Sequence, residues 1–360
     1  MKRNFAFSIA FLFSIIILAQ KPTSVEAAIK RASFLAEQTL IKNKLPGLSI
    51  AISMNGKLIW DEGFGYANME KRIKVNPDKH LFRIGSISKP IIATALGQLM
   101  ESGKIKFDDP IQKYVSYFPP KKYPISIKQV AGHLGGLRHY QGFEFYSNKH
   151  YDDIESAIDT FKNDSLLYQP GSKFTYSSYG WNLLNAVVEG ASGESFTPYM
   201  YKHVFDPLEM TRTHPDDKTK SIEGITHYYI KKSGELITAE DVNLSNKYAG
   251  GGFLSTAPDL IKFAESYNKQ TLLKEETIEQ MWAPMKMNDG KLSRYGIGWR
   301  QGQDKKGRHW VGHNGGSVGG SSAMFLFEEM DLIVVVLCNQ SQANLSDLPL
   351  KIANQFFYKE

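Results

Sequence analysis

The stretch FRIGSISKPIIATALGQLM, residues 82–100, begins as a loop and continues as a mostly apolar helix. Pro90 sets the start of that helix, because a proline has no backbone N–H and is tolerated only in the first turn. The helix therefore cannot begin much before Ser86, which places Ser86 at its amino end. Backbone N–H groups are unpaired at such an end, and the helix dipole favours negative charge there.

Lys89 follows Ser86 by three residues and therefore lies on the same face of the helix. Desolvation and the helix dipole both lower the pKa of an amine in this position, so Lys89 could accept a proton from Ser86 or stabilise an oxyanion. The pair is a candidate activated nucleophile. The alternative is that Ser86 is only a helix cap and Lys89 a surface charge. A second Ser-x-x-Lys, Ser266 to Lys269, lies at the trailing end of a helical segment, and we assign it to chance.

Both ends of the chain carry strand patterns next to a terminal helix. Residues 48–54 alternate apolar and polar side chains before Asn55-Gly56, which predicts a hairpin. SSAMFLF at 321–327 and DLIVVVLCN at 331–339 predict two more strands, and 23–43 and 345–358 predict helices. We expect an α/β (α+β) fold in which about 24–80 and 290–360 build one antiparallel sheet with flanking terminal helices. A mainly helical region, about 86–285, is inserted between them.

The amino terminus has the layout of a secretory signal peptide. Lys2 and Arg3 precede an apolar run from Phe5 to Leu18 and then Ala19. We therefore expect residues 1–20 to be a signal peptide, residues 21–360 to be one domain, and the protein to be exported, either periplasmic or secreted. An uncleaved anchor is the alternative. The single cysteine, Cys338, lies in an apolar run and is expected to be a small buried hydrophobe.

Composition excludes some classes of function. The 360 residues are 42% hydrophobic and carry a formal net charge of +6, with the basic residues spread along the chain. That composition supports a sizeable core, and the scattered charge argues against a nucleic-acid-binding stripe. No HExxH and no paired His/Cys spacing occurs, so we expect no metal and no cofactor.

Two further segments supply candidate partners for Ser86. Tyr176, Ser177 and Ser178 follow a Pro-Gly turn and precede a helical pattern over about 179–189. The run 313–316, His-Asn-Gly-Gly, leads into a strand, and its glycines allow another chain to approach the backbone closely.

Taken together, these segments resemble the serine β-lactamase and penicillin-binding-protein superfamily, in particular its class C β-lactamase-related branch (peptidase family S12 type). The resemblance covers about 24–357 and implies a β-lactamase/transpeptidase-like fold. It rests on LPGLSIAI, FRIGSISKP, ISIKQVAGHLGGLRHY, YQPGSKFTYSSYGWNLL, YAGGGFLSTAPDLIKF, YGIGW and GHNGGSVGGSS. LGGLRHY and KYAGGGFLST are closest in style to the mitochondrial β-lactamase-like serine protease.

The resemblance implies a role for each matching residue. Ser86 is the acylated nucleophile, Lys89 assists proton transfer, and Tyr176 is the second base. The backbone N–H groups of Ser86 and Gly316 form the oxyanion hole. The run 313–315 (His313, Asn314 and Gly315) lines the opposite wall of the cleft. A tyrosine acts as a base at neutral pH only if its pKa is lowered, and the nearby Lys89 is the expected cause.

The chain departs from the class C pattern in two places. Ser178 stands where the second motif usually ends in asparagine, and His313 stands where the third motif usually begins with lysine. A histidine is mostly neutral at pH 7 and holds a substrate carboxylate less well than a lysine. Efficient β-lactam hydrolysis is therefore not expected, whereas acylation chemistry is. His133 and His139 are expected to be structural.

The resemblance thus implies a secreted serine hydrolase that acts through an acyl-enzyme on an amide or ester bond. Its substrate would be a peptide, a D-amino-acid peptide or a carboxylic ester. The alternatives are a true β-lactamase, or a catalytically silent scaffold or filament-forming member of the fold. The expected partners are a small-molecule or peptide substrate and no nucleic acid, with membrane contact only through an uncleaved signal segment. The oligomeric state stays open.

Overall fold

The computed structural model describes residues 25–343, 345 and 347–357. The signal-peptide assignment to residues 1–20 and the amino end of the first helix lie outside these residues. Among the helices described, none combines the length and the apolar character that crossing a bilayer requires.

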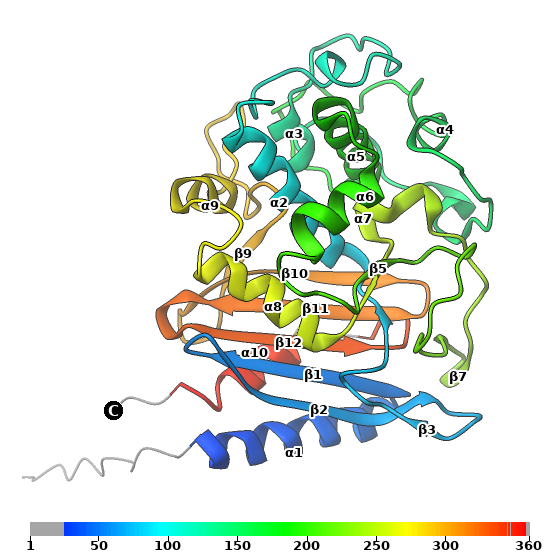
Figure 1. Cartoon of the computed structure of the whole chain (residues 1–360), viewed down its shortest axis with the longest axis vertical. Helices are drawn as coiled ribbons and strands as arrows, with labels where there is room; N and C mark the ends of the chain where they lie inside the picture. Colours follow the sequence, from blue (N-terminus) through cyan, green and yellow to red (C-terminus); the bar gives the residue numbers. More distant parts are fainter. Residues whose placement is uncertain (1–24, 344, 346, 358–360) are drawn as a thin grey trace, which may run out of the picture.

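A seven-stranded sheet forms the base of the molecule, in the order β3-β2-β1-β12-β11-β10-β9 (Figure 1). Neighbouring strands all pair antiparallel. The strands are β1 (Gly47–Met54), β2 (Lys57–Asn68), β3 (Ile73–Lys74), β9 (Arg300–Gln303), β10 (His309–Ser317), β11 (Gly320–Phe327) and β12 (Leu332–Cys338). Leu48 of β1 faces Cys338 of β12, so the two ends of the chain meet in the middle of the sheet. The expected antiparallel sheet built from both chain ends is confirmed.

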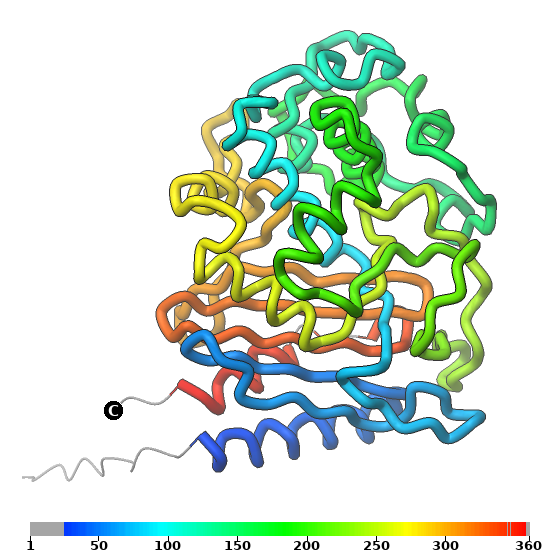
Figure 2. Tube along the Cα trace, viewed as in Figure 1, coloured from blue at the N-terminus to red at the C-terminus, as the bar shows by residue number. Residues whose placement is uncertain are grey.

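The two terminal helices, α1 (Val25–Asn43) and α10 (Asp347–Ala353), cover one face of this sheet. They run side by side beneath the strands, which brings the blue and red ends of the chain together (Figure 2). Leu48, Ile50 and Ile52 of β1 pack into the core on this face, while Ala51 belongs to the core on the other. Successive side chains of β1 thus enter the cores on opposite faces of the sheet, as expected for a central strand that is buried on both faces.

The region between the two halves of the sheet is mainly helical and lies over the other face. Its helices are α2 (Ser88–Glu101), α3 (Ile127–Ala131), α4 (Ile154–Ile158), α5 (Ser178–Ser192), α6 (Phe196–Met200), α7 (Tyr248–Gly251), α8 (Ala257–Asn268) and α9 (Glu275–Trp282). Two small sheets accompany them: β4 (Phe82–Arg83), β8 (Phe253–Ser255) and β5 (His214–Pro215) in one, and β6 (Tyr229–Lys232) with β7 (Glu235–Thr238) in the other. Helix α2 is buried along most of its length and packs against α5 and α7.

A buried ion pair joins the helical region to the large sheet. The Arg83 guanidinium donates to Asp216 Oδ2 at 2.6 Å and to the carbonyl of Val318 at 2.8 Å, and both charged side chains are less than a tenth exposed. Arg83 precedes the α2 segment by a few residues, and Val318 lies in the turn between β10 and β11. The pair therefore fixes the position of these two segments relative to each other.

Removing one charge of this pair leaves the other buried and uncompensated, which typically costs about 3–5 kcal/mol. We therefore expect Asp216→Ala to lower the free energy of unfolding by about that amount, measured by urea denaturation. Asp152→Ala, which removes an exposed carboxylate, serves as the control and should leave the denaturation midpoint unchanged. A midpoint for Asp216→Ala equal to that of the control would contradict this role of the ion pair.

Candidate active site

Ser86 lies in a 3₁₀ turn, Gly85–Ile87, directly before α2. The helix begins at Ser88, so Ser86 precedes its first turn, as the position of Pro90 requires. Between residues 81 and 97, Ser86 is the one residue that is not buried. Its hydroxyl is therefore held by a rigid, buried segment and still faces a cleft.

The backbone of the turn that carries Ser86 packs directly against the backbone of strand β10, with no side chain between the two. Gly85 has φ +51°, and a Cβ added to it would lie 2.6 Å from the backbone nitrogen of Gly316. A Cβ added to Gly315 would lie 2.0 Å from the carbonyl oxygen of Ile84. Glycine is required at both positions, because any side chain would push the strand away from Ser86. This contact brings the exposed Gly316 beside Ser86, in the place expected for an oxyanion hole.

The Lys89 side chain is fully buried, and its amine points at Ser86. Lys89 Nζ lies 2.9 Å from Ser86 Oγ and 3.2 Å from Ser178 Oγ, and it also donates to the carbonyl of Gly250. Desolvation lowers the pKa of Lys89 well below its ordinary value, and the nearby charge of Arg300 adds to the effect. Burial thus disfavours the charged form of this amine, which makes Lys89 a candidate base for the Ser86 hydroxyl.

Tyr176 also faces Ser86, but its ionisation differs from the expectation. Desolvation raises the pKa of Tyr176 to about 12, although a hydrogen bond to Ser86 and the charge of Arg300 both act in the opposite direction. Lys89 Nζ lies 4.9 Å from the centre of the Tyr176 ring. The expectation that Lys89 lowers the pKa of Tyr176 is wrong, because the effect of burial exceeds that of the neighbouring groups. With its pKa raised to about 12, Tyr176 is a neutral phenol that is hydrogen-bonded to Ser86.

Two histidines hold the segment that carries Tyr176. His133 Nδ1 accepts from the backbone N–H of Ser177 at 3.1 Å, and His139 Nδ1 accepts from that of Ser178 at 3.2 Å. The His133 ring also packs on the Tyr176 ring at 4.2 Å between centres. Through these contacts both histidines hold Tyr176 and the start of α5 in place.

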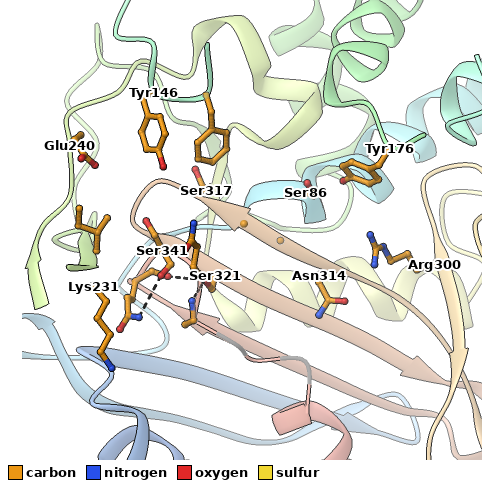
Figure 3. A pocket seen from close by; sticks show the side chains of 17 residues that line it. Ser86, Tyr146, Tyr176, Lys231, Glu240, Arg300, Asn314, Ser317, Ser321 and Ser341 are labelled. Atoms are coloured by element: carbon orange, nitrogen blue, oxygen red, sulfur yellow. Dashed lines mark hydrogen bonds between the residues drawn. The ribbon is translucent and has the colours of Figure 1, made fainter. Parts of the chain in front are cut away.

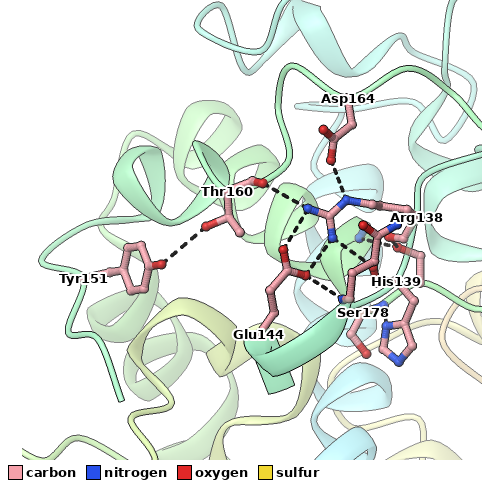
Figure 4. A network of polar contacts seen from close by, with 10 residues as sticks. Arg138, His139, Glu144, Tyr151, Thr160, Asp164 and Ser178 are labelled. Carbon is pink, nitrogen blue, oxygen red and sulfur yellow. Dashed lines mark hydrogen bonds and ion pairs between the residues drawn. The ribbon is translucent and has the colours of Figure 1, made fainter. Parts of the chain in front are cut away.

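The loop around His139 is itself fixed by a polar network (Figure 4). The Arg138 guanidinium binds both oxygens of Glu144 at 2.7 and 3.0 Å and also contacts Asp164 and the carbonyl of Thr160. Glu144 lies in the short 3₁₀ segment Gly142–Tyr146, which forms part of the cleft wall. The network thus holds this wall in place beside Ser178.

His313 lies behind the cleft wall and does not line the cleft. It is 1% exposed, its Nε2 lies 2.8 Å from the Tyr295 hydroxyl, and its Nδ1 lies 2.6 Å from the carbonyl oxygen of Asn314. The carbonyl can only accept, so Nδ1 carries the proton and Nε2 accepts from Tyr295. Desolvation and the charges of Lys89 and Arg300 lower the pKa of His313 well below its usual value. The expectation that His313 lines the opposite wall is therefore wrong, because its ring turns inward to Tyr295.

The cleft in front of Ser86 has a volume of about 820 Å³. Asn314, Gly315 and Gly316 line it as expected, together with Tyr176. Figure 3 shows Ser86 and Tyr176 on the helical side, Asn314 on the sheet, and Arg300 at one end. Arg300 was missed by the sequence reasoning, although it directly follows the YGIGW segment. Its guanidinium lies 5.7 Å from the centre of the Tyr176 ring and supplies the positive charge that His313 lacks.

The second Ser-x-x-Lys pair has no comparable surroundings. Ser266 donates to the carbonyl of Phe263 in its own helix, and Lys269 pairs with Glu265 at 2.8 Å. Its assignment to chance agrees with these contacts. Within the described part of the chain, no three His, Cys, Asp or Glu side chains come together as metal ligands.

Comparison of the sequence and the fold with known proteins shows the family of this chain. The Beta-lactamase family model matches residues 32–355. The human serine beta-lactamase-like protein LACTB, mitochondrial, is 30% identical over 420 aligned positions, which cover 86% of this chain and 76% of that protein. The octameric penicillin-binding protein homologue from Pyrococcus abyssi superposes with a TM-score of 0.81 at 26% identity, over 91% of this chain and 77% of that one.

A penicillin binding protein from Bacillus halodurans has the same fold, with a TM-score of 0.76 at 23% identity over 90% of this chain and 99% of that one. The match over most of the chain agrees with the Ser86 and Lys89 geometry and with the antiparallel sheet. The chain therefore belongs to the β-lactamase family, and it is a serine hydrolase of the β-lactamase and penicillin-binding-protein fold.

Proposed function

We propose that Ser86 is acylated and that the protein cleaves an amide or ester bond in substrates that carry a carboxylate on the leaving group. The observation that carries the proposal is the fully buried Lys89 amine at 2.9 Å from Ser86 Oγ, at the floor of an open cleft. A neutral amine in hydrogen-bond contact with a hydroxyl is the arrangement that general-base activation of a nucleophile needs.

In the first step Ser86 Oγ attacks the substrate carbonyl carbon while its proton passes to Lys89 Nζ. The carbonyl oxygen gains negative charge, and the backbone N–H groups of Ser86 and Gly316 stabilise it. Tyr176, hydrogen-bonded to Ser86 and neutral at rest, hands its proton to the leaving nitrogen or oxygen as the C–N or C–O bond breaks, and recovers one from Lys89. Water then attacks the ester on Ser86, which releases the acid and restores the serine hydroxyl.

The position of Arg300 supports the proposal that the leaving group of the substrate carries a carboxylate. It lies at the end of the cleft near Tyr176 and Asn314, and no carboxylate of the described residues pairs with it. A guanidinium binds a carboxylate through two parallel hydrogen bonds. The substrate class would then be a peptide, a D-amino-acid peptide or a carboxylic ester with a free carboxylate beyond the scissile bond.

β-Lactam hydrolysis is the second candidate function. Arg300 is the observation that favours it, since a β-lactam carries a carboxylate that this side chain would bind in place of the usual lysine of the third motif. The rate at which the protein turns over a chromogenic cephalosporin distinguishes the two candidate functions. The leading proposal expects ester hydrolysis to be faster than cephalosporin turnover, whereas a β-lactamase would show the reverse.

We also propose that the protein works outside the cytoplasm. The support is the pattern of the first 20 residues, in which Lys2 and Arg3 precede an apolar run.

A fluorophosphonate probe tests the acyl-enzyme directly. We expect the protein to be labelled at one site, and Ser86→Ala to remove the label and the ester hydrolysis together. Ser266→Ala, in the other Ser-x-x-Lys pair, is the control and should be labelled as the parent is. Labelling that survives in Ser86→Ala would refute the proposal.

Lys89→Met should lower the rate of Ser86 acylation by about 10²–10⁴-fold, the range of a positioned acid–base group. The base is the neutral amine, so acylation in the parent should rise with pH as Lys89 loses its proton. Because burial lowers the pKa of Lys89, this rise should lie well below pH 10.5 and should vanish in the variant. Stopped-flow acylation at several pH values measures both effects. Lys269→Met should keep the parental profile, and the same profile in Lys89→Met would exclude the proton-transfer role.

Arg300→Gln should lower kcat/KM for 3-carboxyphenyl acetate by about tenfold, the effect of one hydrogen-bonded charge pair, and much less for phenyl acetate. Arg294→Gln removes an exposed arginine that does not line the cleft of Ser86 and serves as the matched control. Equal losses for the two esters in Arg300→Gln would mean that Arg300 does not bind the carboxylate.

A further inference from the structure

A second cavity, the aromatic pocket, borders the cleft of Ser86, and the mechanism above does not use it. Its wall includes Phe174, Tyr295 and Trp310, and it measures about 390 Å³. Arg300 lines this pocket and also lines the cleft of Ser86, so the two cavities border the same side chain. A leaving group held by Arg300 is therefore next to the aromatic pocket.

Neighbouring rings hold the walls of the aromatic pocket in place. Phe174 contacts the rings of His133 and Tyr295, at 5.7 and 6.0 Å between centres, and is nevertheless 39% exposed. Trp310 stacks on Phe325 at 4.3 Å between centres. Packing thus forms the pocket in advance and leaves part of the Phe174 ring open to a ligand.

The register of the large sheet directs a bound substrate toward this pocket. Strand β9 pairs with β10 only as far as Gly312, which faces Arg300. Among the described residues, no strand lies beside β10 on that side beyond Gly312. A substrate that extends along this edge from Gly316 toward Gly312 lies in line with β9. It therefore meets Arg300 and the aromatic pocket.

The lining sets the chemistry of the group that the aromatic pocket would take. Among the described residues that line it, three are aromatic and none is acidic, and the surface they expose is mostly apolar. Aromatic rings pack favourably against one another in offset or edge-to-face contacts. An apolar cavity of about 150 Å³ already admits benzene, so this larger volume admits a phenyl ring or an indole.

We propose that the aromatic pocket binds an aromatic side chain of the leaving group. The inference rests on the proposed function, since it needs acyl transfer to Ser86 and a leaving-group carboxylate at Arg300. The substrate class becomes an amide or ester whose leaving group is an aromatic amino acid or an aromatic 2-hydroxy acid with a free carboxylate. Phe174 and Trp310 contact its ring, while Arg300 pairs with its carboxylate.

The test uses two acetyl esters that differ in one ring. O-Acetyl-3-phenyllactate and O-acetyl-lactate carry the same acyl group and the same carboxylate, and each is prepared in both configurations. We expect kcat/KM for the better phenyllactate ester to exceed that for the better lactate ester by about tenfold or more, the effect of burying a phenyl ring. The readout is the ratio of these two values.

Substitutions at Phe174 connect this ratio to the aromatic pocket. Phe174→Ala removes one wall and should lower the ratio toward one, whereas Phe174→Tyr keeps the ring and should retain the ratio. Phe34→Ala removes an exposed ring from α1, outside both cavities, and is the matched control that should also retain it. A merely structural role of Phe174 would lower both kcat/KM values together and leave the ratio unchanged.

An unchanged ratio in Phe174→Ala, or a parent protein that cleaves the two esters equally well, overturns the inference. If neither ester is hydrolysed although the fluorophosphonate probe labels Ser86, the slowing of that labelling by free 3-phenyllactate and by free lactate is compared, and equal slowing overturns the inference as well. Absence of Ser86 labelling in the parent would refute the proposed function, whereas labelling without a preference for the phenyl ring would refute only the role of the aromatic pocket.

Discussion

The contact between the Lys89 amine and the Ser86 hydroxyl is the interaction on which the proposed chemistry depends, and the burial of Lys89 is what makes that chemistry feasible. A lysine in water would be protonated and could accept nothing. Helix α2 packs between α5 and α7, which removes Lys89 from solvent and surrounds its amine with the Ser178 hydroxyl and the Gly250 carbonyl. Burial also raises the pKa of Tyr176, so desolvation favours the neutral form of both groups, as the proposed base and acid require.

The site also depends on the contact between the two parts of the fold. Ser86 and Tyr176 come from the helical region, while Gly316 comes from the large sheet. The two parts touch through backbone at Gly85 and Gly315, where no side chain fits. The Arg83 ion pair acts beside this contact and is buried, so solvent does not screen it. The geometry of the proposed oxyanion hole thus follows from close packing between strand β10, near the C-terminus, and a turn far away in the sequence.

The charges around the cleft follow a consistent pattern. His133 and His313 are buried, and desolvation lowers the pKa of each well below its usual value, so both are neutral. The positive charge at the cleft comes instead from Arg300, which lines it beside Tyr176. Because a cation at a cleft wall attracts anions, this charge supports the proposal that the substrate carries a carboxylate.

Local patterns in the sequence determined the strands near both termini, the start of α2 near Pro90 and the nucleophile pair of Ser86 and Lys89, because periodicity and proline geometry act over a few residues. The family resemblance added Tyr176 and Gly316. Only the tertiary structure decided that His313 turns away from the cleft, that the pKa of Tyr176 rises, and that Arg300 lines the cleft. Those outcomes depend on burial and on which distant segments pack together, and a pKa or a side-chain direction set by such neighbours leaves no local pattern.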